Sequence, residues 1–391
     1  MCYTGVRHHE PRVGRIGLEM EILQKIDVLG EAAQYDVCRG CGTGDARAQN
    51  DLGRWIYPAV RPDGTRINLL KVLQTNVCER DCFYCANRSQ RDTPRVSFAP
   101  EELARGFEEM VRRGLAQGLF LSSGVCGNAG RAMERMLATV EIIRQRYHFS
   151  GYVHLKILPG ADDASVEAAV RLAQRVSVNL EAPNARRIRA ISASKEFATL
   201  LGPLRQAHRA RRAQERPVSM TTQFVVGAAE ESDQEILATS AGLYSELRLA
   251  RAYYSAFQPI EDTPLEGHPA TPAWREHRLY QADFLLRQYG FRFQELIFDH
   301  QGNLPSHADP KLLWAREHPE AFPLEVNTAS KEQLLRIPGI GPRSAARLLG
   351  WRRQGAVQEL KALALAGADS KRAAPFVLLD GKRPPHQLSL L

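Results

Sequence analysis

Three cysteines lie close together at Cys78, Cys82 and Cys85, directly after the apolar run 67–73. Thiolates are the ligands of iron–sulfur clusters, and four of them make the usual full set. A compact set of three therefore predicts a cluster with one iron left open for chemistry. Zinc sites and disulfides also use neighbouring cysteines. Zinc needs a fourth ligand, however, and three cysteines cannot all pair with one another, so we favour the cluster.

A second pair of cysteines, Cys38 and Cys41, lies in a glycine-rich stretch. Together with Cys2 or Cys126, this pair could supply part of a second cluster or of a zinc site. No second closely spaced pair accompanies it, so two reduced thiols are the favoured interpretation.

The chain of 391 residues is too long for one ordinary domain, which favours one large α/β domain with one or two small modules. Its seven cysteines, three of them clustered, fit metal ligation in a reducing compartment, and we expect a cytoplasmic protein. No apolar run approaches 18 residues, and residues 1–17 hold no signal-peptide core. We therefore expect no association with a membrane.

The cysteines need a scaffold, and the hydrophobic pattern predicts alternating strands and helices. An amphipathic helix is expected over 18–33, and a hairpin over 55–60 and 67–73 with its turn at 61–64. Strand-like runs follow at 119–122, 152–158, 176–180, 220–226 and 249–257. Helical runs lie at 100–113, 131–147, 163–175, 198–214, 233–247 and 273–289. This alternation predicts about six parallel βα units with ligands at the carboxyl ends of the strands.

The cysteine spacing, with Tyr84 directly before the third cysteine, resembles the CxxxCxxC signature of the radical S-adenosylmethionine (SAM) enzymes. The six units match the partial (β/α)6 barrel of that family. The resemblance implies a 4Fe-4S cluster whose open iron is chelated by the amino and carboxylate groups of SAM. It also implies reductive cleavage of SAM to a 5′-deoxyadenosyl radical.

Segments at later strand ends resemble the SAM-binding parts of the family. The stretch 121–124 stands where a Gly-Gly-Glu-like turn is usual, although the glutamate is absent, and 179–183 resembles an Asn-Leu-Asp segment. The stretch 224–227 resembles a GxIxG segment without its first glycine, and 257–260 resembles the loop beside the adenine. The resemblance thus implies SAM contacts at Tyr84, Ser122, Ser123, Gly124, Asn179, Glu181, Gly227, Pro259 and Ile260.

Arginines are dense between 186 and 216, where a solvated helix face is the default expectation. If they faced the mouth of the barrel, they could hold phosphates.

The last sixth of the chain is basic. Residues 326–391 hold eleven Lys and Arg against four Asp and Glu, a net charge of +7 out of +8 for the whole chain. Within them, Ser330 and Gln333 predict a capping box, and Pro342 predicts the start of a second helix. The stretch 338–341 between these helices resembles a helix-hairpin-helix DNA-binding module. Its glycines let backbone amides approach a phosphate, so the predicted nucleic-acid contacts are Gly339, Gly341, Arg343, Ser344 and Arg347. Packing against protein is the alternative use of such a hairpin.

The final residues, Gln387 to Leu391, follow an extended stretch at 382–385 and resemble the peptide by which bacterial repair and replication proteins dock on the sliding clamp. The fold class expected is therefore α/β, a partial (β/α)6 radical SAM barrel with a small all-α helix-hairpin-helix module. The expected division is an N-terminal helix and hairpin extension at 1–66, the barrel at 67–300, a connector at 301–325, the module at 326–380 and a flexible tail at 381–391.

The combination resembles radical SAM proteins of the putative DNA modification or repair family, which lie beside uracil-DNA-glycosylase-like proteins. It implies an enzyme that modifies or repairs a nucleic acid, DNA rather than RNA, with such a glycosylase-like protein as an expected partner. A transfer-RNA-modifying radical SAM enzyme and a non-enzymatic, cluster-containing DNA-binding protein are the alternatives. The target base and the electron donor are not specified by the sequence.

Overall fold

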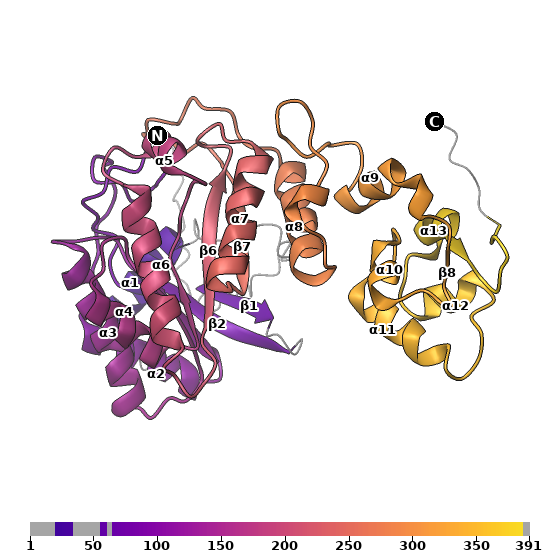
Figure 1. Ribbon diagram of the computed structural model, residues 1–391. Coiled ribbons are helices and arrows are strands. Elements are labelled where there is room, and N and C mark those ends of the chain that lie inside the picture. Colours follow the sequence, from indigo (N-terminus) through magenta and orange to yellow (C-terminus); the bar gives the residue numbers. More distant parts are fainter. Residues whose placement is uncertain (1–19, 34–54, 61–64, 386–391) are drawn as a thin grey trace, which may run out of the picture.

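The computed structural model describes residues 20–33, 55–60 and 65–385. Its core is a seven-stranded sheet whose strands lie in chain order, with helices packed along its outer side (Figure 1). The strands are β1 (Ile56–Val60), β2 (Arg66–Leu73), β3 (Gly118–Ser122), β4 (Tyr152–Lys156), β5 (Arg175–Ser177), β6 (Ser219–Val226) and β7 (Arg251–Ala256). Strands β2 to β7 are parallel, which confirms the partial barrel. The predicted hairpin pairs β1 with β2 in antiparallel register, and its turn lies outside the described residues.

The helices that follow the strands match the predicted helical runs closely. They are α2 (Pro100–Arg112), α3 (Ala129–Gln145), α4 (Asp163–Leu172), α6 (Phe197–Arg211), α7 (Asp233–Leu247) and α8 (Ala273–Gln288). Side-chain caps fix several of the helix starts, since Asn128, Asp162 and Ser232 each accept a hydrogen bond from an amide of the first turn. An additional short helix, α5 (Ala185–Ile191), was not predicted and begins at its cap Asn184.

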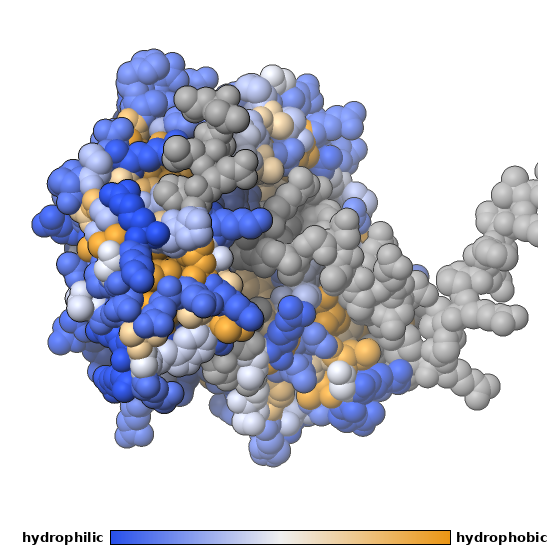
Figure 2. Space-filling view, turned by 90° about the vertical axis from the view of Figure 1, so that its right-hand side faces the viewer, coloured by the Kyte–Doolittle hydropathy of each residue, from blue (hydrophilic) through white to orange (hydrophobic). Residues whose placement is uncertain are grey.

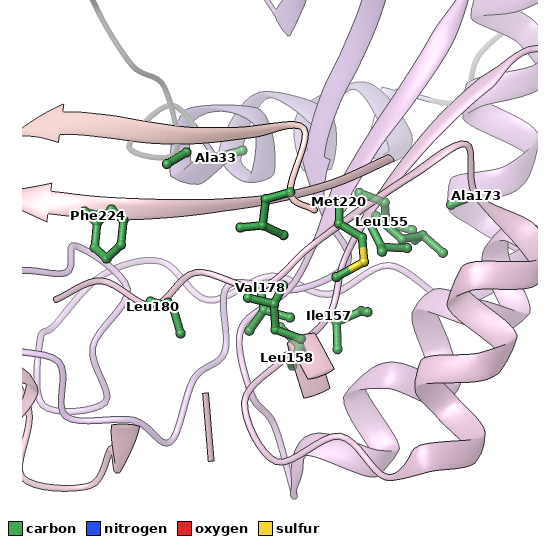
Figure 3. Packing of buried hydrophobic residues seen from close by; sticks show 14 of the residues in the cluster. Ala33, Leu155, Ile157, Leu158, Ala173, Val178, Leu180, Met220 and Phe224 are labelled. Atoms are coloured by element: carbon green, nitrogen blue, oxygen red, sulfur yellow. The ribbon is translucent and has the colours of Figure 1, made fainter. Parts of the chain in front are cut away.

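Alternation along the strands gives the sheet two different faces. Leu155, Met220 and Phe224 on one face are fully buried members of the main hydrophobic core (Figure 3). The opposite face carries polar side chains such as His154, whose Nε2 lies 2.9 Å from Ser177 Oγ. The helices thus cover one side of the sheet and leave a polar inner side.

Helix α1 (Met20–Ala33) packs against β2 and α2. Its buried Ile22, Ile26 and Leu29 belong to the main core, and Lys25 forms an ion pair with Glu102 at 2.6 Å. The prediction of an amphipathic helix that packs on the barrel is therefore confirmed. None of the described helices is long and apolar enough to cross a membrane.

The C-terminal part has a second hydrophobic core, built from residues of 326–379 such as Leu334, Ile340 and Leu348. Its helices are α10 (Lys331–Arg336), α11 (Pro342–Trp351), α12 (Leu360–Leu365) and α13 (Ser370–Ala373), and α9 (Pro310–Glu317) precedes them. The expected all-α composition needs a correction, because β8 (Leu324–Glu325) pairs in parallel with β9 (Val377–Leu378). This pairing joins the two ends of the module. Hydrophilic residues cover much of this side of the molecule, with smaller hydrophobic areas among them (Figure 2).

Candidate active site

The three cysteines lie in the loop that follows the carboxyl end of β2, as expected. All three are free thiols; Cys82 is buried, and Cys78 and Cys85 are partly buried. Burial, with the neighbouring Cys82 as a further cause, raises the pKa of the Cys85 thiol to about 12. A thiolate at this position therefore requires a compensating positive charge, which bound iron would supply. Within the described parts of the chain, no three His, Cys, Asp or Glu side chains are arranged to hold a single metal ion.

The turn after β3 lies against the cysteine loop. The amide of Gly124 donates to Thr75 O at 2.7 Å, and the amide of Glu79 donates to Val125 O at 2.8 Å. A Cβ on Gly124 would lie 2.3 Å from Val77 O and 3.2 Å from Cys78 Cβ. Glycine is therefore required here by the close approach of two backbones, and this approach brings the predicted SAM-binding turn to the cysteines. The neighbouring Ser122 is buried, and Ser123 Oγ donates to Gly124 O.

The cysteine loop is tied to a second loop, which follows α5. The Asp81 carboxylate accepts hydrogen bonds from Ser192 Oγ at 2.7 Å and Ser194 Oγ at 2.6 Å. It also accepts from the amides of Ala193 at 3.1 Å and Ser194 at 3.3 Å. Although partial burial opposes the charge, these hydrogen bonds hold the pKa of Asp81 below its ordinary value. The amide of Phe83, between the second and third cysteines, donates to Ile191 O at 2.9 Å.

The next residue of that second loop, Lys195, reaches the cysteine loop with its side chain. Its Nζ donates to Tyr84 Oη at 3.2 Å and lies 3.6 Å from Glu181 Oε1. Burial works against the charge of Lys195, yet Cys82 and Glu181 keep its pKa above its ordinary value. Burial, the Glu181 carboxylate and Cys82 raise the pKa of Tyr84 well above its usual range. Tyr84, which is partly buried, and the buried Glu181 and Lys195 thus form one polar cluster beside the cysteines.

Glu181 adopts a left-handed backbone conformation, with φ of 64°. Its backbone forms a parallel bridge to Phe224, in which its amide donates to Gln223 O and its carbonyl accepts from Val225. A non-glycine residue in this conformation is uncommon and costs about 1–3 kcal/mol. The surrounding pairing holds it there, and its side chain lies at the mouth of the barrel with Lys195. Asn179, two residues earlier, is also buried at this end of β5.

The predicted adenine-side segments lie at the carboxyl ends of β6 and β7. Gly227 has φ of 90°, and a Cβ on it would lie 2.0 Å from Thr271 Oγ1, so only glycine fits. Its carbonyl accepts from His268 Nε2 at 3.0 Å, while Ile260 O accepts from Thr263 Oγ1 at 2.7 Å. Pro259 is exposed in the same loop. Sheet topology places these segments at the same edge as the cysteine loop, and their contacts with SAM stay predictions.

The arginine-rich stretch 186–216 divides into a smaller group at 186–189 and a larger group at 205–216. The larger group lies away from the mouth of the barrel. Arg187 binds the Glu235 carboxylate through Nε at 3.1 Å and Nη2 at 2.8 Å. Arg211 and Arg216 donate to the carbonyls of Leu247 and Ala173, at the ends of α7 and α4. Those helix ends precede strands, so they lie at the amino edge of the sheet, opposite the cysteine loop. The possibility that Arg211 and Arg216 line the mouth is therefore wrong.

The predicted hairpin is formed between α10 and α11. Ser330 and Gln333 make the expected capping box, and α11 begins at Pro342. Gly339 has φ of 86°, and Gly341 is the N-cap of α11, whose first turn has no side-chain cap. Arg343 and Arg347 are exposed on α11, but the Ser344 side chain is only 4% exposed. Ser344 can therefore contribute its amide to a phosphate site, but not its hydroxyl.

A second hairpin, which the sequence analysis missed, joins α12 to α13. Gly367 has φ of 83°, close to the value of Gly339 in the first hairpin. The amide of Asp369 donates to Gly339 O at 2.9 Å, and a Cβ on Gly339 would lie 2.4 Å from Asp369 O. The two hairpins therefore pack backbone against backbone. Asp369 also caps α13 by accepting from the amide of Arg372, so an acidic side chain occupies this second helix start.

Two residues of the site, Asp81 and Lys195, were missed by sequence reasoning. Asp81 lies between Cys78 and Cys82, at a position to which the motif assigns no particular residue or role. Lys195 stands 14 residues after Glu181, in a segment without a recognisable pattern. Only the path of the chain through α5 brings these residues together.

The central part of the chain, which carries this site, matches a known protein family. The family model described as the radical SAM superfamily matches residues 72–240. No curated protein sequence matches the chain. Among solved structures, the chain is similar to HydG, a maturase of the [FeFe]-hydrogenase, with 12% identity and a TM-score of 0.46 over 55% of this chain. The chain covers 48% of HydG, about half its length.

Two further solved structures are similar to the chain. Methylornithine synthase (PylB) has 13% identity and a TM-score of 0.46, covering 69% of this chain and 70% of PylB. A radical SAM methyltransferase from Sphaerobacter thermophilus has 14% identity and a TM-score of 0.44, covering 60% of this chain and 75% of the methyltransferase. The superfamily match includes Cys78, Cys82 and Cys85, which carry the spacing that binds the 4Fe-4S cluster. Residues 72–240, which form most of the barrel and carry the three cysteines, belong to the radical SAM superfamily.

Proposed function

We propose that this radical SAM enzyme acts on a nucleic acid, and on DNA in particular, which it modifies or repairs. The observation that carries the proposal is the uncapped helix start at Gly341 together with two exposed arginines on α11. A 4Fe-4S cluster, when bound, supplies the electron that cleaves SAM. The chain's own residues would bind SAM, orient it and exclude water.

The first turn of α11 is suited to an anion. Pro342 has no amide hydrogen, and the amides of Arg343 and Ser344 belong to the helix start that no side chain caps. A helix N-terminus favours negative charge and directs its amides toward a phosphate. Arg343 and Arg347 add positive charge on the same helix. The two neighbouring helices, α10 and α13, are capped by Ser330 and Asp369, so their starts are already satisfied.

Helix α8 relates this hairpin to the mouth of the barrel. Its N-terminal end follows Thr271, which contacts Gly227, while a Cβ on Gly341 would lie 3.3 Å from the hydroxyl of Tyr289, directly after its C-terminal end. A helix of 16 residues is about 24 Å long. A duplex that contacts both places would span about seven base pairs at 3.4 Å each. We therefore propose a substrate longer than a single nucleotide.

The charge of the module supports the proposal only in part. Of the eleven basic residues at 326–391, Arg336 binds Glu295, Arg352 donates to the carbonyl of Ala329, and Arg372 binds Asp309. These three contact other parts of the protein, and Arg347, although exposed, also donates to the carbonyl of Ala366 at 3.4 Å. The others are exposed, namely Lys331, Arg343, Arg347, Arg353, Lys361, Lys371, Lys382 and Arg383. Phosphate contacts of this kind carry no base information, so the target base has to be selected at the mouth of the barrel.

The test compares two double variants that remove the same charge. Arg343→Gln with Arg347→Gln should weaken binding of a 20-base-pair duplex. It should also reduce the slope of log K against log salt by about 0.9 for each phosphate that the protein no longer neutralises. Lys331→Gln with Lys361→Gln, on α10 and α12, should leave most of the slope in place. Equal effects of both doubles would assign the affinity to general charge and overturn the hairpin site.

Competition between duplex DNA and folded RNA distinguishes the proposed substrate from transfer RNA, since the hairpin contacts phosphates that both possess. Mass analysis of nucleosides from cells lacking the protein would then identify the base. The proposed clamp-docking peptide at 387–391 and the pair Cys38 and Cys41 lie outside the described residues. We propose clamp docking, a uracil-DNA-glycosylase-like partner and a cytoplasmic location together with the DNA function.

A further inference from the structure

A buried lysine, Lys195, faces the cysteine loop, although lysine is not one of the residues that bind iron–sulfur clusters. Lys195 is 8% exposed, and its Nζ lies 5.6 Å from the centroid of the Tyr84 ring, between the second and third cysteines in sequence. Cys82 and Cys85 are among the groups that keep the pKa of Lys195 above its ordinary value. Its nearest carboxylate, Glu181, lies 3.6 Å away. A charged lysine is rarely buried without a function or a partner, because removing an ammonium from water is costly.

The position of Lys195 is fixed by the cysteine loop itself. The four hydrogen bonds that Asp81 accepts all come from 192–194, the residues directly before Lys195. Arg80 adds a hydrogen bond from its guanidinium to Ser194 O at 3.3 Å. The loop that carries the lysine and the loop that carries the cysteines therefore form one unit. The ammonium is therefore held beside the cysteine loop rather than reaching it by chance from a mobile surface chain.

We propose that Lys195 is a positioning residue for charge, which raises the reduction potential of the cluster bound by Cys78, Cys82 and Cys85, and that Glu181 acts in the opposite direction. Adding one electron makes the cluster more negative. A fixed ammonium beside it stabilises the reduced form, and a fixed carboxylate destabilises it. Net charge, hydrogen bonds to sulfur and solvent exposure are known determinants of cluster potentials. The proposal rests on the superfamily cofactor and is independent of the nucleic-acid substrate.

The alternative is that Lys195 and Glu181 form an ion pair that only stabilises the loop, or that Lys195 serves only to bind the SAM carboxylate. A purely structural pair would change cluster retention but not potential. A purely SAM-binding lysine would change SAM affinity and leave the potential measured without SAM unaltered. The reduction potential of the cluster, measured without SAM, therefore distinguishes these three possible roles of Lys195.

The experiment is a redox titration of the reconstituted, full-length protein without SAM, followed by the electron paramagnetic resonance signal of the reduced cluster. Lys195→Met should make reduction at least about tenfold less favourable, a shift of about 59 mV to more negative potential for a one-electron couple. Lys195→Arg keeps the positive charge, so its reduction potential should stay close to that of the wild type. Glu181→Gln should shift the potential in the positive direction. Arg189→Met, which removes an exposed charge on α5, is the matched control and should change nothing.

Opposite shifts for Lys195→Met and Glu181→Gln would establish the proposal. An unchanged potential in Lys195→Met overturns it, whether or not SAM binding, followed by calorimetry, is lost. If Lys195→Met does not retain iron, Glu181→Gln and Lys195→Arg decide the matter. A Glu181→Gln protein with the wild-type potential would then overturn it as well.

Discussion

Lys311 of α9 donates a hydrogen bond from Nζ to the carbonyl of Ile340 at 2.6 Å, and so connects the helix that follows the barrel to the first hairpin of the C-terminal module. The ammonium also lies 4.6 Å from the centroid of the Tyr289 ring, at the end of α8. Asp309, Arg336 and Arg372 are the charged groups around it. A buried, hydrogen-bonded amine thus ties the proposed phosphate-binding hairpin to the rest of the protein, in addition to the ion pair of Arg336 with Glu295.

Lys311→Met should remove a pH dependence of stability. Burial lowers the pKa of Lys311 from 10.5 to about 7 in the folded protein. Between those values the unfolded chain binds one more proton than the folded protein, so folding stability rises with pH by up to about 1.4 kcal/mol per unit. The free energy of unfolding of the wild type, relative to Lys311→Met, should therefore increase from pH 7 to pH 10. Urea unfolding followed by tryptophan fluorescence measures it, and a pH-independent difference would contradict the lowered pKa.

Gly339→Ala should destabilise the module although it adds only one methyl group. The left-handed backbone and the 2.4 Å approach to Asp369 O both oppose a side chain, and a cost of at least about 1–3 kcal/mol is expected. Gly350→Ala is the control, since nothing lies within 4 Å of its Cβ position and it lies inside α11. That change should stabilise the helix by about 0.5–1 kcal/mol. Equal effects in urea unfolding would show that the hairpins do not pack as described.

Much of the barrel could be predicted because its elements are long and periodic. The predicted helix at 233–247 coincides with α7, and the predicted run 100–113 differs from α2 by one residue. Short elements carry too little pattern. Helix α5 has seven residues and follows Pro183, while β8 and β9 have two residues each, so hydrophobic periodicity could not reveal them.

The same difference holds for the site. Residues in local sequence patterns could be predicted, whereas residues that only the fold brings together could not. The cysteine spacing and Gly124 are local signals at ends of strands, and the structure brings Gly124 to Cys78. Asp81 and Ser194, the residue before Lys195, stand 113 residues apart in the sequence, and the fold brings them into contact through the loop that follows α5. The second hairpin was missed because it lacks the Gly-x-Gly pattern of the first: Asp369 stands where Gly341 stands in that hairpin.

Asp81→Asn should loosen the cysteine loop. The carboxylate accepts four hydrogen bonds from 192–194, and an amide group cannot accept at its nitrogen, so at least one donor loses its partner. Loss of hydrogen bonds to a charged group should lower the free energy of unfolding by about 1–3 kcal/mol. Faster loss of iron during gel filtration should accompany it. Asp92→Asn, at an exposed position in the same loop, should retain both iron and stability; equal iron loss in the two variants would argue against this role of Asp81.

Replacing the three cluster cysteines together should abolish both iron binding and SAM cleavage. Cys78, Cys82 and Cys85 are the free thiols that carry the superfamily spacing, and a side chain of alanine offers iron no ligand. Iron content after reconstitution and formation of 5′-deoxyadenosine under reduction are the measurements. Cys126→Ala is the matched control, because Cys126 is a free, partly buried cysteine close to the cysteine loop in the turn after β3. Retention of iron by the triple variant would remove the cluster from these residues, whereas loss of iron in Cys126→Ala would add a fourth thiol to the site.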